Sequence, residues 1–327
     1  MMAENAVLER MLLEADPART SRDARPDADA IRTRDRIIRE AARAPRRRRR
    51  TLGWATGLAV AASAAVVAVV ALQPHQQAVA GSPEPLDFEG AQSISQTLET
   101  ARQTLGSAPG PVEPMRTVRS ASWGYDINMT TGETKVVPAL TTLTWEPDLS
   151  RRITTVAGTP YAPDDAEANT TAEVSSSGEI VSDVVMGPGE FTTPVVDPPG
   201  ATRDELFAML RAYGMPESPS GSDVVRAIQS ALGLWMLTND QEAALLGILA
   251  DAGGAEPLGV STDRLGRPVS GLRVLTDRGT ASDVVLLSRE TGRIVGVERT
   301  VLGDEGYVPP GAILSYQMWD VDEELVR

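Results

Sequence analysis

Residues 52–72 read LGWATGLAVAASAAVVAVVAL, a run of 21 residues without a charged side chain that directly follows the run Arg46 to Arg50. A helix rises about 1.5 Å per residue, so this run would be about 31 Å long, close to the ~30 Å hydrocarbon thickness of a bilayer. The sequence therefore predicts one transmembrane helix over 51–72. Every other residue must then lie on one side of the membrane or the other.

The charges around this helix predict its orientation. Ten arginines lie within about twenty residues before it, whereas the first lysine or arginine after it is Arg102. The positive-inside rule places residues 1–50 in the cytoplasm as a basic tail, and residues 73–88 and 89–327 outside as a polar stalk and an extracytoplasmic domain. The side chains that set this topology are Arg46, Arg47, Arg48, Arg49 and Arg50.

Two other interpretations of the apolar run stay open. Ala78-Val79-Ala80 before Gly81 has the small-residue pattern of a signal-peptidase site, so the run could be a signal sequence that is cleaved after Ala80. Against this, the run is longer than a usual signal core, and a tail of fifty residues precedes it. Arg49-Arg50 also fits a twin-arginine export signal, although the pair lies within a longer arginine run.

Small residues recur every fourth position in the apolar run, at Gly53, Gly57, Ala61 and Ala65. Such a stripe lets two transmembrane helices approach closely, and it predicts a homodimer that pairs through this face. Because alanine is frequent in the run, a stripe that arises by chance is the alternative.

The formal net charge of −14 is unevenly divided along the chain. Residues 1–50 have a net charge of +5 and residues 51–327 a net charge of −19. An acidic outer domain argues against nucleic acid as a partner, and a basic run beside the bilayer is most simply attracted to anionic membrane lipid. There is no cysteine, which excludes disulfides and thiol chemistry, so the core alone must stabilise the outer domain.

Hydrophobic periodicity predicts an α+β domain. Helices are expected near 94–105, 202–213, 222–237 and 240–252, and strands near 116–129, 135–146, 151–158, 179–186, 257–263, 269–277, 282–302 and 311–321. Gly106 is expected to end the first helix, and Thr202 with Glu205 forms a capping box. Sequential hairpins imply an antiparallel sheet with a helical insert. Leu143 and Trp145 share one strand face, which predicts a sheet buried on one side.

Four residues are expected to make tight turns between strands: Gly132, Gly266, Thr291 and Gly292. Glycine supplies a positive φ at little steric cost, and a threonine before it can bond the turn backbone. Asp263 is expected to cap the turn at Gly266 or to pair with Arg267.

The search for chemistry finds no catalytic, cofactor or metal residues. The only histidine, His75, lies in the predicted stalk, so a Ser-His-Asp triad or a histidine metal cluster cannot be built in the domain. No nucleotide-binding or hydrolase motif occurs. Acidic runs near 164–167 and 320–324 lack the ligand pattern of an EF-hand loop. The sequence therefore predicts a protein that is not an enzyme. A hydrolase that uses carboxylates alone would need two of them to converge in a cleft.

Aromatic residues could line a concave apolar pocket, and these are Trp123, Tyr125, Trp145, Tyr316 and Trp319. Such a pocket would suit a lipid or lipoprotein ligand. Ordinary packing in a hydrophobic core is the alternative role for the same side chains.

The C-terminal third contains Leu249-Ala250, Gly254, Gly259-Val260, Asp263, Gly266-Arg267 and Glu290-Thr291-Gly292. With the arginine tail and the apolar run, this pattern resembles an actinobacterial family of uncharacterised single-pass membrane proteins. Its members are often encoded beside extracytoplasmic-function sigma factors, so the resemblance implies a sigma factor as a cytoplasmic partner. The helix-then-sheet order is also similar to the LolA and RseB class of half-barrel domains, which hold lipid or lipoprotein in a concave sheet.

The expected function is a single-pass membrane protein with a non-enzymatic extracytoplasmic sensing or regulatory domain, linked to sigma-factor signalling. The tail lacks the histidine and cysteine of a zinc-bearing anti-sigma domain, which weakens that specific version. The alternative is a membrane-tethered binder or carrier of lipid or lipoprotein with a LolA-like fold.

Overall fold

The computed structural model of the chain describes residues 85–127, 134–161, 173–276, 279–303 and 310–326, with the side chains of 124–127 and 134–135 excepted. All of them belong to the second of two compact units, Met1–Leu52 and Gly53–Arg327. Within the described ranges, no helix is long and apolar enough to cross a membrane. Several predicted features lie outside these ranges: the run Arg46 to Arg50, the stripe Gly53, Gly57, Ala61 and Ala65, and the turn residue Gly132.

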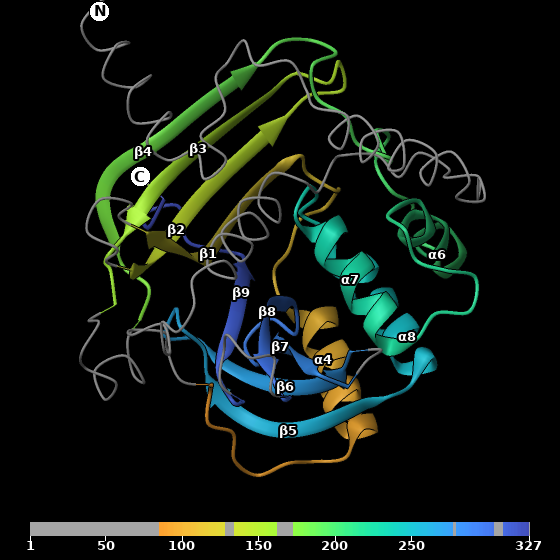
Figure 1. The fold of residues 1–327 in the computed structure, drawn as a ribbon. Coiled ribbons are helices and arrows are strands. Elements are labelled where there is room, and N and C mark those ends of the chain that lie inside the picture. Colours follow the sequence, from red (N-terminus) through yellow and green to blue (C-terminus); the bar gives the residue numbers. More distant parts are fainter. Residues whose placement is uncertain (1–84, 128–133, 162–172, 277–278, 304–309, 327) are drawn as a thin grey trace, which may run out of the picture. The chain divides into compact units, whose positions relative to one another are not determined.

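An antiparallel sheet forms the framework of the domain and has nine strands in the described residues (Figure 1). The strands are β1 (Thr117–Ile127), β2 (Thr134–Trp145), β3 (Arg151–Gly158), β4 (Ser176–Met186), β5 (Ala255–Thr262), β6 (Pro268–Leu275), β7 (Ala281–Ser288), β8 (Ile294–Val301) and β9 (Ile313–Trp319). Their order across the sheet is β4-β3-β2-β1-β9-β8-β7-β6-β5. The predicted α+β class with an antiparallel sheet is confirmed.

Two meanders make up this sheet. Strands β1 to β4 pair in sequence, as do β5 to β9, because short connections favour antiparallel pairing of neighbours. The meanders join where β9 pairs with β1 over three residue pairs, from Ser120 with Trp319 to Ser122 with Gln317, whereas β1 and β2 pair over eleven. The last strand of the chain is therefore the central strand of the sheet.

Four helices lie on the concave side of the sheet in the described part of the chain (Figure 1). Helix α4 (Ile94–Ser107) precedes β1, whereas α6 (Arg203–Ala212), α7 (Gly221–Leu232) and α8 (Asn239–Ala252) connect the two edge strands, β4 and β5. Each helix begins with a capping box, formed by Ser93 with Gln96, Thr202 with Glu205, Ser220 with Asp223 and Thr238 with Gln241. The helical insert thus lies where the sequence predicts it.

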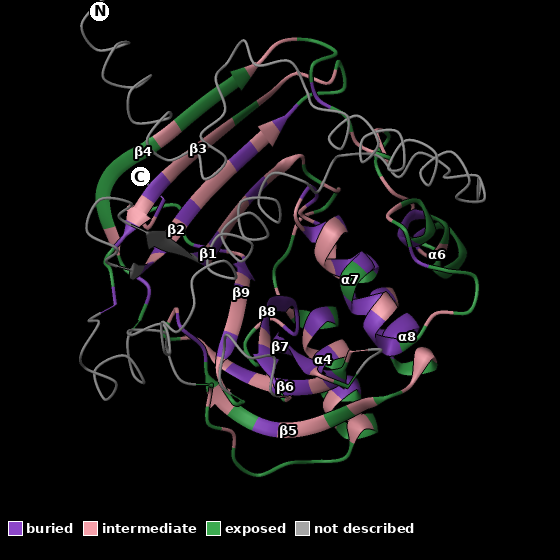
Figure 2. Cartoon of the chain, in the orientation of Figure 1, coloured by how far each residue is buried: buried purple, intermediate pink, exposed green. Residues whose placement is uncertain are grey.

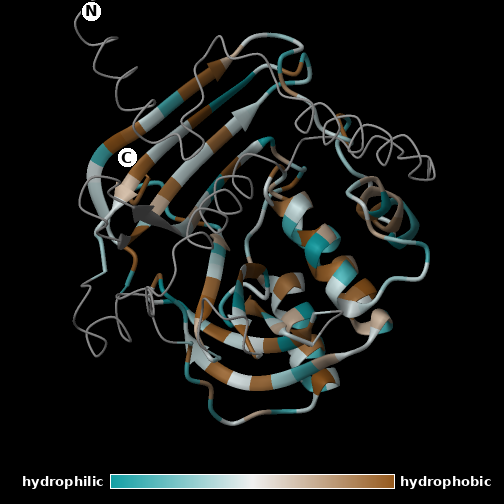
Figure 3. Cartoon of the chain, in the orientation of Figure 1, coloured by the Kyte–Doolittle hydropathy of each residue, from teal (hydrophilic) through white to brown (hydrophobic). Residues whose placement is uncertain are grey.

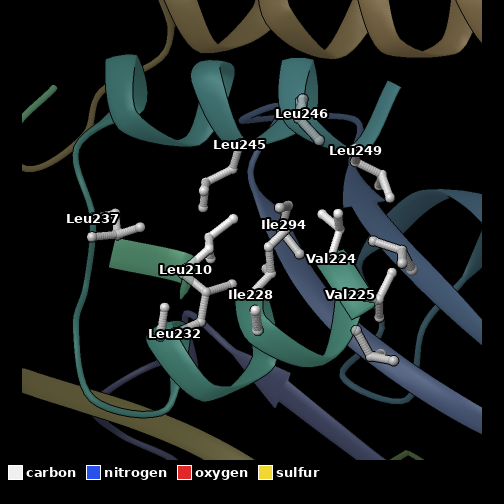
Figure 4. Close-up of a cluster of buried hydrophobic side chains, with 14 of the residues drawn as sticks. Leu210, Val224, Val225, Ile228, Leu232, Leu237, Leu245, Leu246, Leu249 and Ile294 are labelled. Atoms are coloured by element: carbon white, nitrogen blue, oxygen red, sulfur yellow. The ribbon is translucent and has the colours of Figure 1, made fainter. Parts of the chain in front are cut away.

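The first core fills the space between the helices and the sheet (Figure 4). Its side chains recur at helical spacing on one face of each helix, and the fully buried ones include Leu210, Val224, Val225, Ile228, Leu245, Leu246, Leu249 and Ile294. Removing one such side chain from water contributes about 1.5–3 kcal/mol. This core fastens the helical insert to the sheet.

The opposite face of the sheet carries two smaller cores. The second core contains Ala121, Trp123, Val136, Leu140, Val156, Tyr161, Val174, Ile313, Tyr316, Met318, Val321 and Val326. The third core contains Val269, Val284, Leu286 and Val295, with Leu86, Phe88 and Leu258 packed against it. Every residue of β7 is buried as a result (Figure 2).

Three details of the sequence prediction are wrong. Gly106 lies inside α4, which continues to Ser107 because Pro109 keeps Ala108 out of the helical conformation. The helix predicted over 222–237 ends at Leu232, and Met236 beyond it pairs with Met115 in an isolated β-bridge. Strand β2 is not buried on one side alone, because Leu140 enters the second core while Leu143 and Trp145 enter the first.

Candidate functional site

The aromatic residues singled out from the sequence do not line one common pocket. Trp123 and Tyr316 lie in the second core, with their ring centroids 6.2 Å apart, whereas Trp145 and Trp319 lie in the first. Alternation along each strand puts the two pairs on opposite faces of the sheet. The side chain of Tyr125 is outside the described set. All four described rings are buried, so they serve as packing residues.

Trp145 is part of an aromatic cluster that also holds a cation. Its ring centroid lies 4.9 Å from that of Trp235 and 5.7 Å from that of Phe191. The Arg116 guanidinium lies 4.9 Å from the centroids of both tryptophans and donates a 2.9 Å hydrogen bond to the Val196 carbonyl. Cation–π attraction of this kind strengthens as the site loses water. The cluster ties the segment before α6 to the sheet.

The turn residues within the described ranges act as the sequence predicts. Gly266 and Gly292 have φ of +74° and +76°, and the Thr291 hydroxyl accepts a hydrogen bond from the Arg293 amide at 3.3 Å. A Cβ at Gly292 would lie 2.1 Å from the Ala101 carbonyl of α4, so this glycine also permits a close approach of helix and turn. Asp263 both caps its turn and pairs with Arg267.

The main charged site is the Arg293 cluster, defined here as Asn239, Glu242, Arg293 and Asp320. The guanidinium of Arg293 contacts the carboxylate of Glu242 at 2.5 Å and that of Asp320 at 2.6 Å, and it donates to the Asn239 side chain at 3.0 Å. Glu242 and Asn239 come from α8, Arg293 from the turn before β8, and Asp320 directly follows β9. One arginine therefore fastens the helical insert to two strands of the sheet.

Asn239 extends the Arg293 cluster to a fourth element. Its amide donates to the carbonyls of Leu105 and Ala108, which are at the end of α4, at 3.0 and 2.9 Å. These carbonyls have no partner within the helix, so the amide caps them. Asp320 itself is one of two non-glycine residues with a positive φ in the described backbone, at +54°, and its carbonyl accepts from Arg267.

The charges of the Arg293 cluster are unbalanced, because one guanidinium faces two carboxyl groups. The Glu242 side chain is 1% exposed and that of Asp320 is 27% exposed. Burial raises the pKa of Glu242 to about 8, with the charge of Asp320 adding to the rise and Arg293 opposing it. Burial therefore favours the protonated form of Glu242, which reduces the excess of negative charge in the cluster.

The cavity beside the Arg293 cluster is too small for a substrate. It has a volume of about 10 Å³ and is lined by residues that include Arg119, Trp235, Glu242 and Trp319. That volume suits about one water molecule. Two carboxyl groups do converge here, as a carboxylate hydrolase would require, but the space beside them has no room for a substrate. The geometry supports a fastening role for the cluster.

Four of the nine large hydrophobic side chains that are exposed in the described residues lie on β4. They are called the β4 edge here and are Ile180, Val181, Val184 and Val185. Their exposed fractions are 61%, 56%, 46% and 70%. Figure 2 shows β4 mostly exposed, and Figure 3 shows hydrophobic bands along it. Strand β4 pairs only with β3, so its outer backbone groups have no strand partner among the described residues. A bulge near Val181 leaves Ser182 to Met186 as the regular part of this edge.

Sequence reasoning missed both sites, although each leaves a signal. Asp283 and Glu298 interrupt apolar strands, so each needs a buried partner, and Glu242 directly precedes the apolar run of α8. The β4 edge shows as four β-branched residues in a stretch without alternation.

Comparison of the chain with protein-family models, curated proteins and solved structures finds no match.

Proposed function

We propose that the chain is a single-pass membrane protein whose extracytoplasmic α+β domain is a non-enzymatic sensing or regulatory module. In this proposal residues 51–72 cross the membrane, the basic tail binds a cytoplasmic regulatory partner such as a sigma factor, and the outer domain binds an envelope protein. The observation that carries the proposal is the position of the exposed apolar surface. Four exposed apolar side chains lie on the edge strand β4, whereas the space between the helices and the sheet is filled by the first core.

The β4 edge fits an extended protein segment that adds to the sheet as a tenth strand. Such a segment gains main-chain hydrogen bonds from the free edge. Its side chains pack on Val184 at one face of the sheet and on Val185 at the other. Asp183 is already paired with Arg152 at 2.7 Å, so it needs no cation from the partner. The net charge of −19 on residues 51–327 opposes an acidic partner and a second copy of this chain. The partner segment is therefore β-branched and neutral or basic.

The carrier of lipid or lipoprotein is the second candidate, supported by the half-barrel-like curvature of the sheet around its helices (Figure 1). A pocket for a small apolar ligand usually needs about 300 Å³ or more. The cavity at the Arg293 cluster has about 10 Å³. An open hollow of about 610 Å³ on α4 is lined mainly by polar side chains, among them Gln96, Glu99 and Arg102. A carrier role would thus require the helices to leave the sheet.

The proposal is tested by removing residues 1–40 and, separately, by changing Val185→Lys in the chromosomal copy. Both changes should alter the same set of transcripts, because one removes the cytoplasmic output and the other blocks the outer binding edge. Val112→Lys is the matched control, since Val112 is 99% exposed and lies outside the sheet. Unchanged transcription after removal of residues 1–40 would refute the signalling proposal. Lipid recovered in equal molar amount with the purified full chain would favour the carrier.

A further inference from the structure

The segment immediately before α4 is seated on the far edge of the sheet. Residues 85–89, Pro-Leu-Asp-Phe-Glu, are called the strap here and include the last four residues of the predicted stalk and the first residue of the predicted domain. Glu89 and Val260 of β5 exchange two backbone hydrogen bonds, of 3.0 and 2.8 Å, and the Ser261 hydroxyl donates to the Asp87 carbonyl at 2.5 Å. Leu86 and Phe88 pack against the third core. The strap thus covers part of the β5 edge.

Two glycines form the seat of the strap. Gly259 of β5 and Gly271 of β6 lie directly opposite each other in the strand register. A Cβ at Gly259 would lie 2.1 Å from the Glu89 carbonyl oxygen, and a Cβ at Gly271 would lie 2.3 Å from the Phe88 ring. Any side chain at either position would displace the strap. Because neither glycine has a side chain, the sheet has a notch at this pair, which accommodates the backbone of Glu89 and the ring of Phe88.

One end of the strap reaches a buried ion pair. The Leu86 amide donates to the Glu298 carboxylate at 3.4 Å, and that carboxylate accepts from Arg264 at 2.9 Å. The Arg264 guanidinium lies 5.7 Å from the Tyr316 ring centroid, and the Tyr316 hydroxyl lies 3.3 Å from that of Tyr161. A continuous polar path therefore leads from the strap to the second core and to the central strand β9.

The strap is weakly held in comparison with the cores. It contributes two half-buried apolar side chains and a few hydrogen bonds, whereas each strand of the sheet is paired along most of its length. Segments with few buried contacts open locally at a much lower free energy than the whole domain. Detachment of the strap exposes little surface and leaves all nine described strands paired.

We propose that the strap is a detachable link between the stalk and the domain, with the notch at Gly259 and Gly271 as its seat. Seated, it holds the domain directly against the end of the stalk. Detached, it lets the folded domain move freely on a longer tether. The consequence for signalling rests on the proposed function, because it requires residues 51–72 to be a membrane anchor. The seat and its opening do not depend on that assignment.

The test uses the absence of cysteine, which makes any introduced thiol unique. Leu86→Cys reports on the strap, and Leu246→Cys, which is fully buried in the first core on the other face of the sheet, reports on the domain. Both are labelled with a thiol reagent in the full chain in mild detergent. The strap thiol should react at least 100-fold faster than the core thiol, and its rate should be nearly independent of low urea. Equal rates with equal urea dependence would overturn the proposal.

Second substitutions then locate the seat. Gly271→Ala intrudes on the Phe88 ring, and Phe88→Ala removes that ring from the strap, so each should speed labelling of the strap thiol at least 10-fold. The rate at Leu246→Cys should stay within twofold. Gly106→Ala is the matched control, because a Cβ there meets no atom within 4 Å. An equal increase at both thiols would mean that the whole domain was destabilised and would overturn the proposal. These rates are independent of transcription, so this proposal and the proposed function can fail separately.

Discussion

Replacing Glu242 by glutamine should change how the stability of the domain depends on pH. Glutamine has nearly the shape of a protonated glutamate and no charge at any pH. Burial raises the pKa of Glu242 from the ordinary 4.5 to about 8 in the folded chain. Between these two values the unfolded chain has lost the proton while the folded chain retains it. Unfolding is therefore favoured as pH rises from 4.5 to 8, and the wild-type protein loses stability over that range.

The expected magnitude follows from the two pKa values. One pKa unit corresponds to about 1.36 kcal/mol, so the full difference corresponds to about 5 kcal/mol. Below pH 4.5 Glu242 is protonated in both states and contributes no pH dependence. Above pH 8 the loss is complete. The free energy of unfolding of Glu242→Gln, relative to wild type, should thus rise by several kcal/mol between pH 5 and pH 8.5.

Urea unfolding followed by tryptophan fluorescence measures this difference. Trp123, Trp145, Trp235 and Trp319 are all buried, so unfolding exposes them to water. The full chain in non-ionic detergent is unfolded at several pH values, as wild type and as Glu242→Gln. Glu179→Gln, at an exposed position of β4, controls for the loss of one carboxylate charge. Parallel pH profiles of wild type and Glu242→Gln would refute the reasoning, because Glu242 would then be ionised in the folded chain.

Asp320→Asn provides an independent check on the cause. It removes the second carboxyl group from Arg293, and asparagine tolerates the φ of +54° at this position. The remaining pair, Glu242 with Arg293, is then balanced in charge. The fall in stability should therefore move to lower pH and become smaller. A profile identical to that of wild type would show that Asp320 does not influence Glu242.

Two further substitutions test the turn and the aromatic cluster. Gly292→Ala should destabilise the domain by more than about 1 kcal/mol, because alanine is strained at this positive φ. The new Cβ also meets the Ala101 carbonyl, which should lower the free energy of unfolding further. Gly189→Ala, with the same φ of +76° and open space around it, should show only the first cost in the same urea assay. Trp235→Ala should cost about 3–5 kcal/mol, since it leaves a cavity beside Trp145 and removes one cation–π face from Arg116. A Trp235→Phe variant that is no more stable than Trp235→Ala would contradict this packing argument.

Local features were predictable from the sequence because their causes are local. The strand over 151–158 matches the observed Arg151–Gly158, and the capping box of Thr202 and Glu205 forms as expected. Each depends on residues within a few positions of one another, as does the positive φ of Gly292. The α+β class followed from the order of these elements alone.

The candidate sites depend on pairings that no local pattern encodes. Glu242, Arg293 and Asp320 come from three elements, and only the folded sheet brings them together. The sequence left open whether the aromatic residues line a pocket or pack in a core, because the face that each strand buries was unknown. Strand β2 buries Leu140 on one face and Trp145 on the other, so neighbouring aromatics enter different cores. The transmembrane helix, its pairing stripe and the sigma-factor partner stay predictions.

The central position of β9 has a consequence for how the domain is made. Strand β9 follows the other eight described strands in the chain, so the strand that joins the two meanders is synthesised after both of the strands with which it pairs. Until β9 is synthesised, β1 and β8 each have an unpaired edge, and the side chains of β8 that are buried in the folded domain lack their neighbouring strand. A chain cut short before Ile313 would therefore lack the middle of this sheet, and its two meanders would stay unjoined.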